Sequence, residues 1–156
     1  MSRESRRLAG ILLVLLPTVV AGGASILALI DDPAYRANEL RQDLWRAGHA
    51  HAGVLLVLAL VTLRYVDEAE LGRRAAWFAR HSVPAAAVLL PSAFFLSVSD
   101  AGATEPNALI SLAYVGAVLL TAGLLTLGVG LVRSPVAGHP GVTSRPHHGP
   151  GTRSAR

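Results

Sequence analysis

The hydrophobic positions of this 156-residue chain fall into four long blocks that are separated by short polar segments. The first and last blocks contain no charged residue. At a helical rise of 1.5 Å per residue, about 20 apolar residues cross the hydrocarbon core of a bilayer, which is about 30 Å thick. The pattern therefore predicts an all-α integral membrane protein, a four-helix bundle with spans at 8–30, 47–64, 75–99 and 108–132.

The first apolar block has two interpretations. Residues 1–7 are polar and basic, and small residues at 21–25 could form the cleavage region of a secretory signal peptide. The uncharged run at 8–30 is longer than the core of a signal peptide, which is about 7–15 residues. We therefore expect a retained first helix that follows a cytoplasmic N-terminus and is kinked at Pro17.

A polar segment with helical periodicity follows the first block. Asp32 is a favourable N-cap residue, and Pro33 is favourable at the first helical position. From Ala37 to Leu44 the apolar residues recur on one helical face, with charged residues between them. This pattern predicts a short amphipathic helix at 33–46 on the outer membrane surface. After the last block, Ser, Pro, Gly, Thr, His and Arg dominate, which predicts a disordered tail at 133–156.

Composition agrees with a membrane protein. Hydrophobic residues make up 52% of the chain and charged residues 15%, whereas soluble domains average about 25% charged residues. The net charge of +4 comes from arginines next to the apolar blocks, so it indicates orientation in a lipid bilayer, with no nucleic-acid partner. Arginines are densest at the N-terminus, in the middle loop and in the tail, which predicts that both termini are on the cytoplasmic side of the plasma membrane. The absence of cysteine excludes disulfides and thiol chemistry.

Two histidines lie where the second block enters the membrane. His49 and His51 are surrounded by alanine and glycine, so the helix surface around them is nearly bare. Residues i and i+2 are about 200° apart on a helix, so the two imidazoles cannot bind one ion from the same regular helix. The bare surface fits either a closely packed neighbouring helix or a flat cofactor such as haem. Two interpretations stay open: polar residues near the interface, or ligands for haem or copper.

The His-x-His pattern at this helix start also resembles a group of small uncharacterised four-helix bacterial proteins of the inner membrane. These in turn are distantly similar to the N-terminal helices of the catalytic subunits of haem–copper oxidases and nitric oxide reductases. The resemblance implies that His49 or His51 matches a histidine that binds the low-spin haem near the outer leaflet. This chain has no histidine in the first or fourth expected span and no histidine set for a copper centre. A second haem ligand would therefore come from a partner, most simply His51 of another copy.

Arg80 and His81 form a second candidate site. They lie about one turn inside the third expected span, close to Pro84. Ionisable groups inside a membrane are costly and are often functional, although an arginine near a helix end can extend its charge to the headgroups. We weigh two interpretations here, a purely structural pair and a site for a proton or an anion.

The remaining features favour packing over catalysis. Four glycines of the last block predict close helix contacts: Gly116, Gly123, Gly128 and Gly130. The sequence has no phosphate-binding loop and no nucleophile triad, and its apolar blocks lack acidic residues. We therefore expect an accessory or assembly module of a membrane complex, either a homo-oligomer or a partner of other membrane subunits. The alternative is a haem- or copper-binding protein of electron transfer or cofactor handling that uses His49 or His51.

Overall fold

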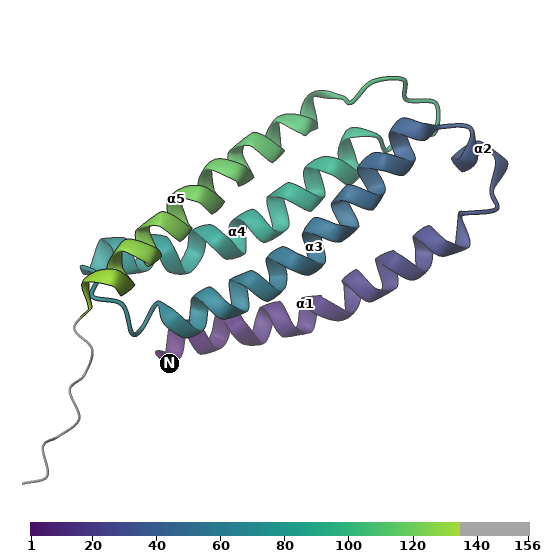
Figure 1. Cartoon of the computed structure of the whole chain (residues 1–156). Coiled ribbons are helices and arrows are strands. Elements are labelled where there is room, and N and C mark those ends of the chain that lie inside the picture. Colours follow the sequence, from purple (N-terminus) through teal and green to yellow (C-terminus); the bar gives the residue numbers. More distant parts are fainter. Residues whose placement is uncertain (135–156) are drawn as a thin grey trace, which may run out of the picture.

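The computed structural model describes residues 1–134, and all its regular elements are helices (Figure 1). They are α1 (Arg3–Ala28), α2 (Pro33–Arg36), α3 (Glu39–Tyr65), α4 (Arg73–Ser97), the 3₁₀ helix η1 (Ala108–Ile110) and α5 (Ser111–Arg133). The four long helices are long and apolar enough to cross a membrane, which confirms the predicted fold class. The tail expected from residue 133 lies outside the described residues, apart from Arg133, which ends α5, and Ser134, which caps it.

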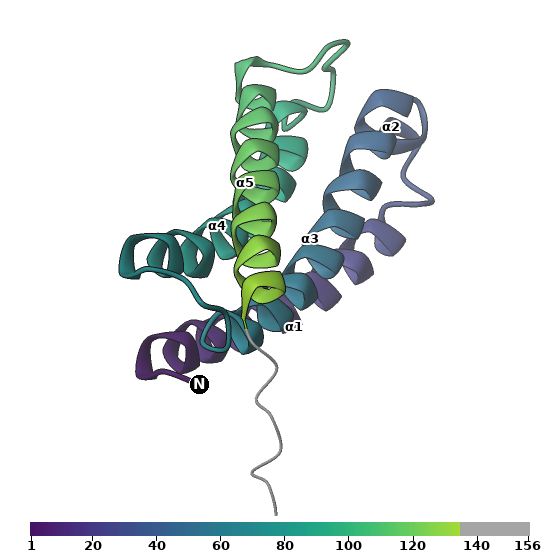
Figure 2. The ribbon, with the colours of Figure 1, turned by 60° about the vertical axis from the view of Figure 1, so that its left-hand side comes forward.

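The four long helices are arranged as a row in the order α1, α3, α4, α5. Each packs mainly on its neighbours in the row, and α1 scarcely touches α4. Figure 2 shows that α1 and α3 diverge from α5 towards the end that carries α2. The start of α1, the α3–α4 loop and the end of α5 lie together at the opposite end (Figure 1). The row leaves much of α1 without a protein neighbour.

The segment expected to be one amphipathic helix is divided in the structure. Asp32 caps α2 as predicted, because its side chain accepts a hydrogen bond from the Tyr35 backbone N–H. Asn38 then interrupts the helix and serves as the N-cap of α3, while its side-chain amide donates to the carbonyls of Ala101 and Ala103 at 3.0 Å. Residues 39–46 are thus the first turns of α3 and continue directly into the second span.

The first helix also starts earlier than the apolar pattern suggests. Ser2 is its N-cap, and the Ser2 hydroxyl accepts a hydrogen bond from the Ser5 backbone N–H at 3.1 Å. The polar residues 3–7, expected to precede the span, therefore form its first turns. Their helical conformation directs Glu4 and Ser5 towards α4, where both side chains bond to Arg80.

Close contact between α4 and α5 depends on glycine. Gly116, Gly123 and Gly130 recur every seven residues and are all buried. Their neighbours are Leu90 and Ser82 of α4, and Leu71 of the preceding loop. A repeat of seven residues keeps one helix face against its partner in a left-handed crossing. The predicted close contacts are confirmed for these three glycines, whereas Gly128 has no atom within 4 Å of an added Cβ.

Two prolines shape α4 itself. Pro84 and Pro91 lie inside the helix and are buried. A proline removes one backbone hydrogen bond and bends a helix at that point. Figure 2 shows the first turns of α4 directed away from α5 before the helix runs alongside it. This bend directs the first turns of α4, where Arg73 and Trp77 lie, away from α5.

We predict that Gly123→Ala lowers the stability of the protein by about 1–3 kcal/mol, the typical cost of overpacking. An added Cβ would overlap the Ser82 hydroxyl and lie 3.1 Å from Ser82 Cβ. Gly128→Ala is the matched control, because nothing surrounds that position and alanine is the better helix former. Thermal unfolding in mild detergent measures both variants, and equal midpoints would contradict the packing role of Gly123.

Candidate functional site

An ionic cluster joins α1, the α3–α4 loop and α4 at the end where α1 begins. We call it the Arg80 cluster; its members are Ser2, Glu4, Ser5, Asp67, Arg80 and His81. The guanidinium of Arg80 donates from Nη1 to Glu4 Oε2 at 2.9 Å and from Nη2 to Asp67 Oδ1 at 2.8 Å. Its Nε donates to Ser5 Oγ at 2.9 Å. The Arg80 side chain is only 11% exposed, so these three partners replace most of its hydration.

Ser5 is the buried centre of the cluster, with no exposed surface. Its hydroxyl donates to Asp67 Oδ1 at 3.3 Å and accepts from Arg80 Nε and from the Ser2 hydroxyl. The hydroxyl thereby uses its one donor and both acceptor positions. A serine here satisfies two side chains that belong to different elements, which no apolar residue of similar size would do.

Asp67 receives hydrogen bonds from two directions. Besides Arg80 and Ser5, the Ser2 backbone N–H donates to Asp67 Oδ2 at 2.6 Å. Burial raises the pKa of Asp67, but the hydrogen bonds from the Ser2 backbone, Arg80 and Ser5 outweigh it and hold the pKa below its ordinary value. The carboxylate is therefore held in its charged form and pins the start of α1 to the α3–α4 loop.

His81 extends the cluster towards the surface. Its Nδ1 lies 2.8 Å from the Trp77 carbonyl, which can only accept, so Nδ1 carries a proton. Its ring stacks on Trp77 with centroids 4.6 Å apart. Nε2 lies 3.4 Å from Glu4 Oε1, where a doubly protonated ring would attract the carboxylate. The structure thus brings the predicted pair Arg80 and His81 onto one acidic partner, Glu4.

The acidic half of this cluster was not predicted from the sequence. Glu4 lies in a polar terminus and Asp67 in a charged loop, and neither stands out in such surroundings. The available signal was physical: an arginine inside a span needs an acidic partner at the same depth. Four spans bring the N-terminus and the middle loop to the same end, so Glu4 and the acids of the loop were the candidates.

His49 and His51 lie on different sides of α3, as their spacing predicted. The imidazole of His49 packs against Gly23 of α1, where an added Cβ would lie 2.9 Å from His49 Cε1. His51 is exposed, and its ring lies 5.1 Å from that of Phe94 on α4. His51 Nδ1 is 2.7 Å from the Ala47 carbonyl, so Nδ1 carries the proton and Nε2 is the free nitrogen. The two rings do not converge on a common site.

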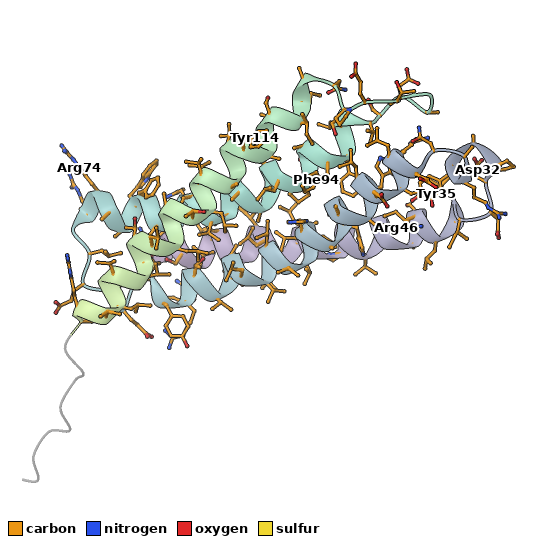
Figure 3. All side chains as sticks on the ribbon, turned by 45° about the horizontal axis from the view of Figure 1, so that its top comes forward. Asp32, Tyr35, Arg46, Arg74, Phe94 and Tyr114 are labelled. Atoms are coloured by element: carbon orange, nitrogen blue, oxygen red, sulfur yellow. The ribbon has the colours of Figure 1, made fainter. Side chains whose placement is uncertain are left out.

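Side chains from neighbouring helices fill much of the bare surface of α3. The ring of Phe95 lies on Gly48, with Cε2 at 3.0 Å from an added Cβ. Trp45 packs edge-on against Phe95 and also contacts Tyr35 of α2, which is buried. Figure 3 shows Tyr35 on α2 and, on α4, Phe94, the neighbour of Phe95 in the sequence that contacts His51. The small residues therefore admit aromatic side chains from α4 and the close approach of α1.

An open groove remains beside His49. It has a volume of about 460 Å³ and is lined by Val19 of α1 and by His49, Ala50, Gly53, Val54 and Val57 of α3. Its surface is apolar apart from His49. Among residues 1–134, no group of three or more His, Cys, Asp or Glu side chains could hold a metal ion. Among the residues that line the groove, His49 is the one side chain that could bind a metal ion.

No family model matches the chain, and neither does a curated protein or a solved structure.

We predict that acid weakens the fold through Asp67. Because its folded-state pKa is below that of an unfolded aspartate, about 3.9, its contribution is complete above that pH and is lost as the pH falls through the folded-state value. Asp67→Asn should cost about 1–3 kcal/mol at neutral pH, since Arg80 and Ser5 lose a charged partner. It should also flatten the fall in melting temperature between neutral and acidic pH.

Thermal midpoints in mild detergent, recorded as a pH series, measure this effect. Asp43→Asn is the matched control, because the Asp43 side chain is 77% exposed and pairs only loosely with Arg46. An Asp67→Asn variant that keeps the wild-type acid response would contradict the prediction.

Proposed function

We propose that this chain is a non-catalytic accessory or assembly module of a membrane complex, located in the plasma membrane. The single observation that carries the proposal is the packing of α1. Only 6% of the most apolar window of α1 is buried, compared with 50% in α4. Beyond its first turns, α1 packs mainly on α3, so it offers the rest of its surface to lipid or to another transmembrane helix.

The composition of that surface favours a helix as the neighbour. Thr18, Ala21 and Ser25 are exposed and share one face of α1. Gly22 lies beside them, with nothing within 4 Å of an added Cβ. The hydroxyls of Thr18 and Ser25 donate to carbonyls of α1 itself, so the face is small and internally satisfied. Such small-residue faces let helix backbones approach closely, which is how transmembrane helices associate in lipid.

The groove beside His49 supports the same proposal. It runs between α1 and α3, and its walls are apolar. A partner helix seated on the small face of α1 can place an apolar side chain there and meet the His49 imidazole. The occupant that we propose is an apolar transmembrane helix, a second copy of this chain in the simplest case.

The orientation in this proposal follows from the arginines. Arg64, Arg73, Arg74 and Arg133 lie at the end where α1 begins, which the positive-inside rule assigns to the cytoplasm. A reporter fused at residue 70 checks this assignment, and an external signal would reverse it.

We predict that the small face of α1 forms cross-links in membranes. The chain has no cysteine, so single substitutions are clean probes. Ala21→Cys and Ser25→Cys should form disulfide dimers on mild oxidation, or photo-cross-links to another subunit when a photoreactive residue replaces the cysteine. Val118→Cys is the matched control, because Val118 is an exposed apolar residue of α5. Cross-linking at Ala21 and Ser25 no greater than at Val118 would contradict the proposal.

A cofactor function is the second candidate, and the geometry of His51 favours it. Its Nδ1 is fixed by the Ala47 carbonyl, and the ring is exposed with Nε2 free. Metal-binding histidines commonly have this arrangement, since a hydrogen bond at one nitrogen orients the other towards the metal. Because His49 and His51 do not converge, residues 1–134 offer one histidine ligand to such a group, and the haem or copper of this candidate would be shared between two copies or with another subunit.

The cofactor candidate predicts a haem absorption band or bound copper in protein purified in mild detergent after haem and copper supplementation. The signal should be lost in His51→Ala. It should be retained in His81→Ala, the matched control, because His81 lies in the Arg80 cluster on α4 and does not contact His51. Colourless, copper-free wild-type protein would contradict the candidate without affecting the assembly proposal.

A further inference from the structure

A pocket of about 370 Å³ opens at the start of α4, on the outer side of the Arg80 cluster. We call it the arginine–tryptophan pocket; it is lined by Glu4, Arg73, Arg74, Trp77 and Arg80. All but Glu4 belong to the first two turns of α4. The pocket lies at one end of a membrane-spanning helix, the level at which lipid headgroups meet protein.

The positive charge available in this pocket is that of Arg73 and Arg74. Arg80 is already neutralised by Glu4 and Asp67. Arg73 and Arg74 are exposed, and no acidic side chain within residues 1–134 forms an ion pair with either. Figure 3 shows Arg74 extending away from the start of α4. Two adjacent guanidinium groups offer planar forks that match the oxygens of a phosphate.

The backbone adds further donors next to these arginines. Gly72 is the N-cap of α4 and supplies no side-chain acceptor for the first backbone N–H groups of the helix. These groups carry a partial positive charge and favour an anion. The charge of Arg73 and Arg74 and the free N–H groups of the first turn thus point to the same kind of ligand.

Trp77 supplies an apolar wall. Trp77 is 56% exposed, and its ring is held by stacking on His81, which in turn bonds to the Trp77 carbonyl. Tryptophan is enriched at the membrane–water interface, because one part of the ring is apolar and its N–H is polar. A ligand that satisfies the whole pocket therefore has an anionic group for the arginines and an apolar part for Trp77.

We propose that the arginine–tryptophan pocket binds the headgroup of an anionic phospholipid. The phosphate is held by Arg73 and Arg74 at the start of α4, and the glycerol and first methylenes of the acyl chains lie along Trp77. Glu4 also lines the pocket, but its carboxylate is engaged by Arg80. Arg80 pairs with two carboxylates, Glu4 and Asp67, so one negative charge remains, and the two positive charges of Arg73 and Arg74 exceed it. This pocket is separate from the small face of α1, and the lipid site and the proposed helix contact do not depend on each other.

The two tryptophans of the chain allow a direct test. Trp45→Phe leaves Trp77 as the single fluorescent reporter, and it removes an indole N–H that has no hydrogen-bond partner. This variant is reconstituted into phosphatidylcholine vesicles that contain increasing fractions of brominated phosphatidylglycerol or, separately, brominated phosphatidylcholine. Bromine quenches tryptophan on contact, so quenching reports which lipid occupies the pocket.

We expect brominated phosphatidylglycerol to quench Trp77 with at least about fivefold higher relative affinity than brominated phosphatidylcholine, the factor that one basic residue gives at an anionic surface. The preference should disappear in Arg73→Gln/Arg74→Gln. It should persist in Arg36→Gln/Arg46→Gln, which removes the same charge from exposed arginines at the other end of the protein. Helix content and melting temperature confirm that each variant is folded.

Three results would overturn the proposal. The first is equal quenching by the two lipids in the Trp45→Phe protein. The second is a preference that survives in Arg73→Gln/Arg74→Gln. The third is relief of quenching by inorganic phosphate at millimolar concentration, which would identify the ligand as a soluble anion. As a second measurement, the thermal midpoint of the unmodified protein in detergent should rise more with phosphatidylglycerol than with phosphatidylcholine, and an equal rise would also count against the proposal.

Discussion

The guanidinium of Arg80 carries a full positive charge on a side chain that is only 11% exposed. Removing such a charge from water costs several kcal/mol unless other groups replace the water. In this protein the replacements come from outside α4: Glu4 and Ser5 belong to α1, and Asp67 belongs to the α3–α4 loop. The requirement to neutralise one charge therefore connects three segments that are far apart in the sequence.

This requirement explains how α1 is held at all. Along the membrane, α1 packs mainly on α3, and nonspecific apolar contact gives little preference for protein over lipid. At its first turn, however, Ser2, Glu4 and Ser5 are fixed by Asp67 and Arg80. The hydrogen bonds and ion pair at its first turn fix where α1 begins relative to α4 and the α3–α4 loop. The contacts with α3 determine which face of α1 is covered by protein. The small face of α1 is thereby presented at a defined angle.

The sequence predicted the elements of this fold well, because crossing a bilayer imposes a length and a composition that are visible in a single chain. The four long apolar helices were predicted in this way. Local residue preferences predicted the Asp32 cap and the contacts of three of the four α5 glycines. The division of the 33–46 helix at Asn38 was not predicted. It depends on hydrogen bonds from Asn38 to Ala101 and Ala103, which are more than 60 residues away. Gly128 shows the same limit: composition marks a glycine as a packing residue, but only the helix rotation decides which glycines face a neighbour.

In the candidate sites too, features set by local helix geometry could be predicted, whereas contacts with distant residues could not. The opposite placement of His49 and His51 follows from helical geometry alone, so it could be predicted. Their neighbours could not, because Gly23 and Phe94 reach them from α1 and α4, and nothing local in the sequence fixes that pairing. For Arg80, burial and charge indicated that partners must exist but not which acids provide them. The sequence thus indicates that burying the charge of Arg80 requires acidic partners, and the structure identifies these partners as Glu4 and Asp67.

The neutralisation of Arg80 also has a consequence for its neighbours on α4. Arg73 and Arg74 lie less than two turns before it, and three unpaired arginines at such spacing would repel one another. Because Glu4 and Asp67 take up the charge of Arg80, the remaining charge is concentrated at the outermost turn, next to the exposed Trp77. Arg80 therefore joins segments of this chain, and Arg73 and Arg74 remain available to groups outside the protein. In a membrane the nearest matching charge at that level is the phosphate of a lipid headgroup.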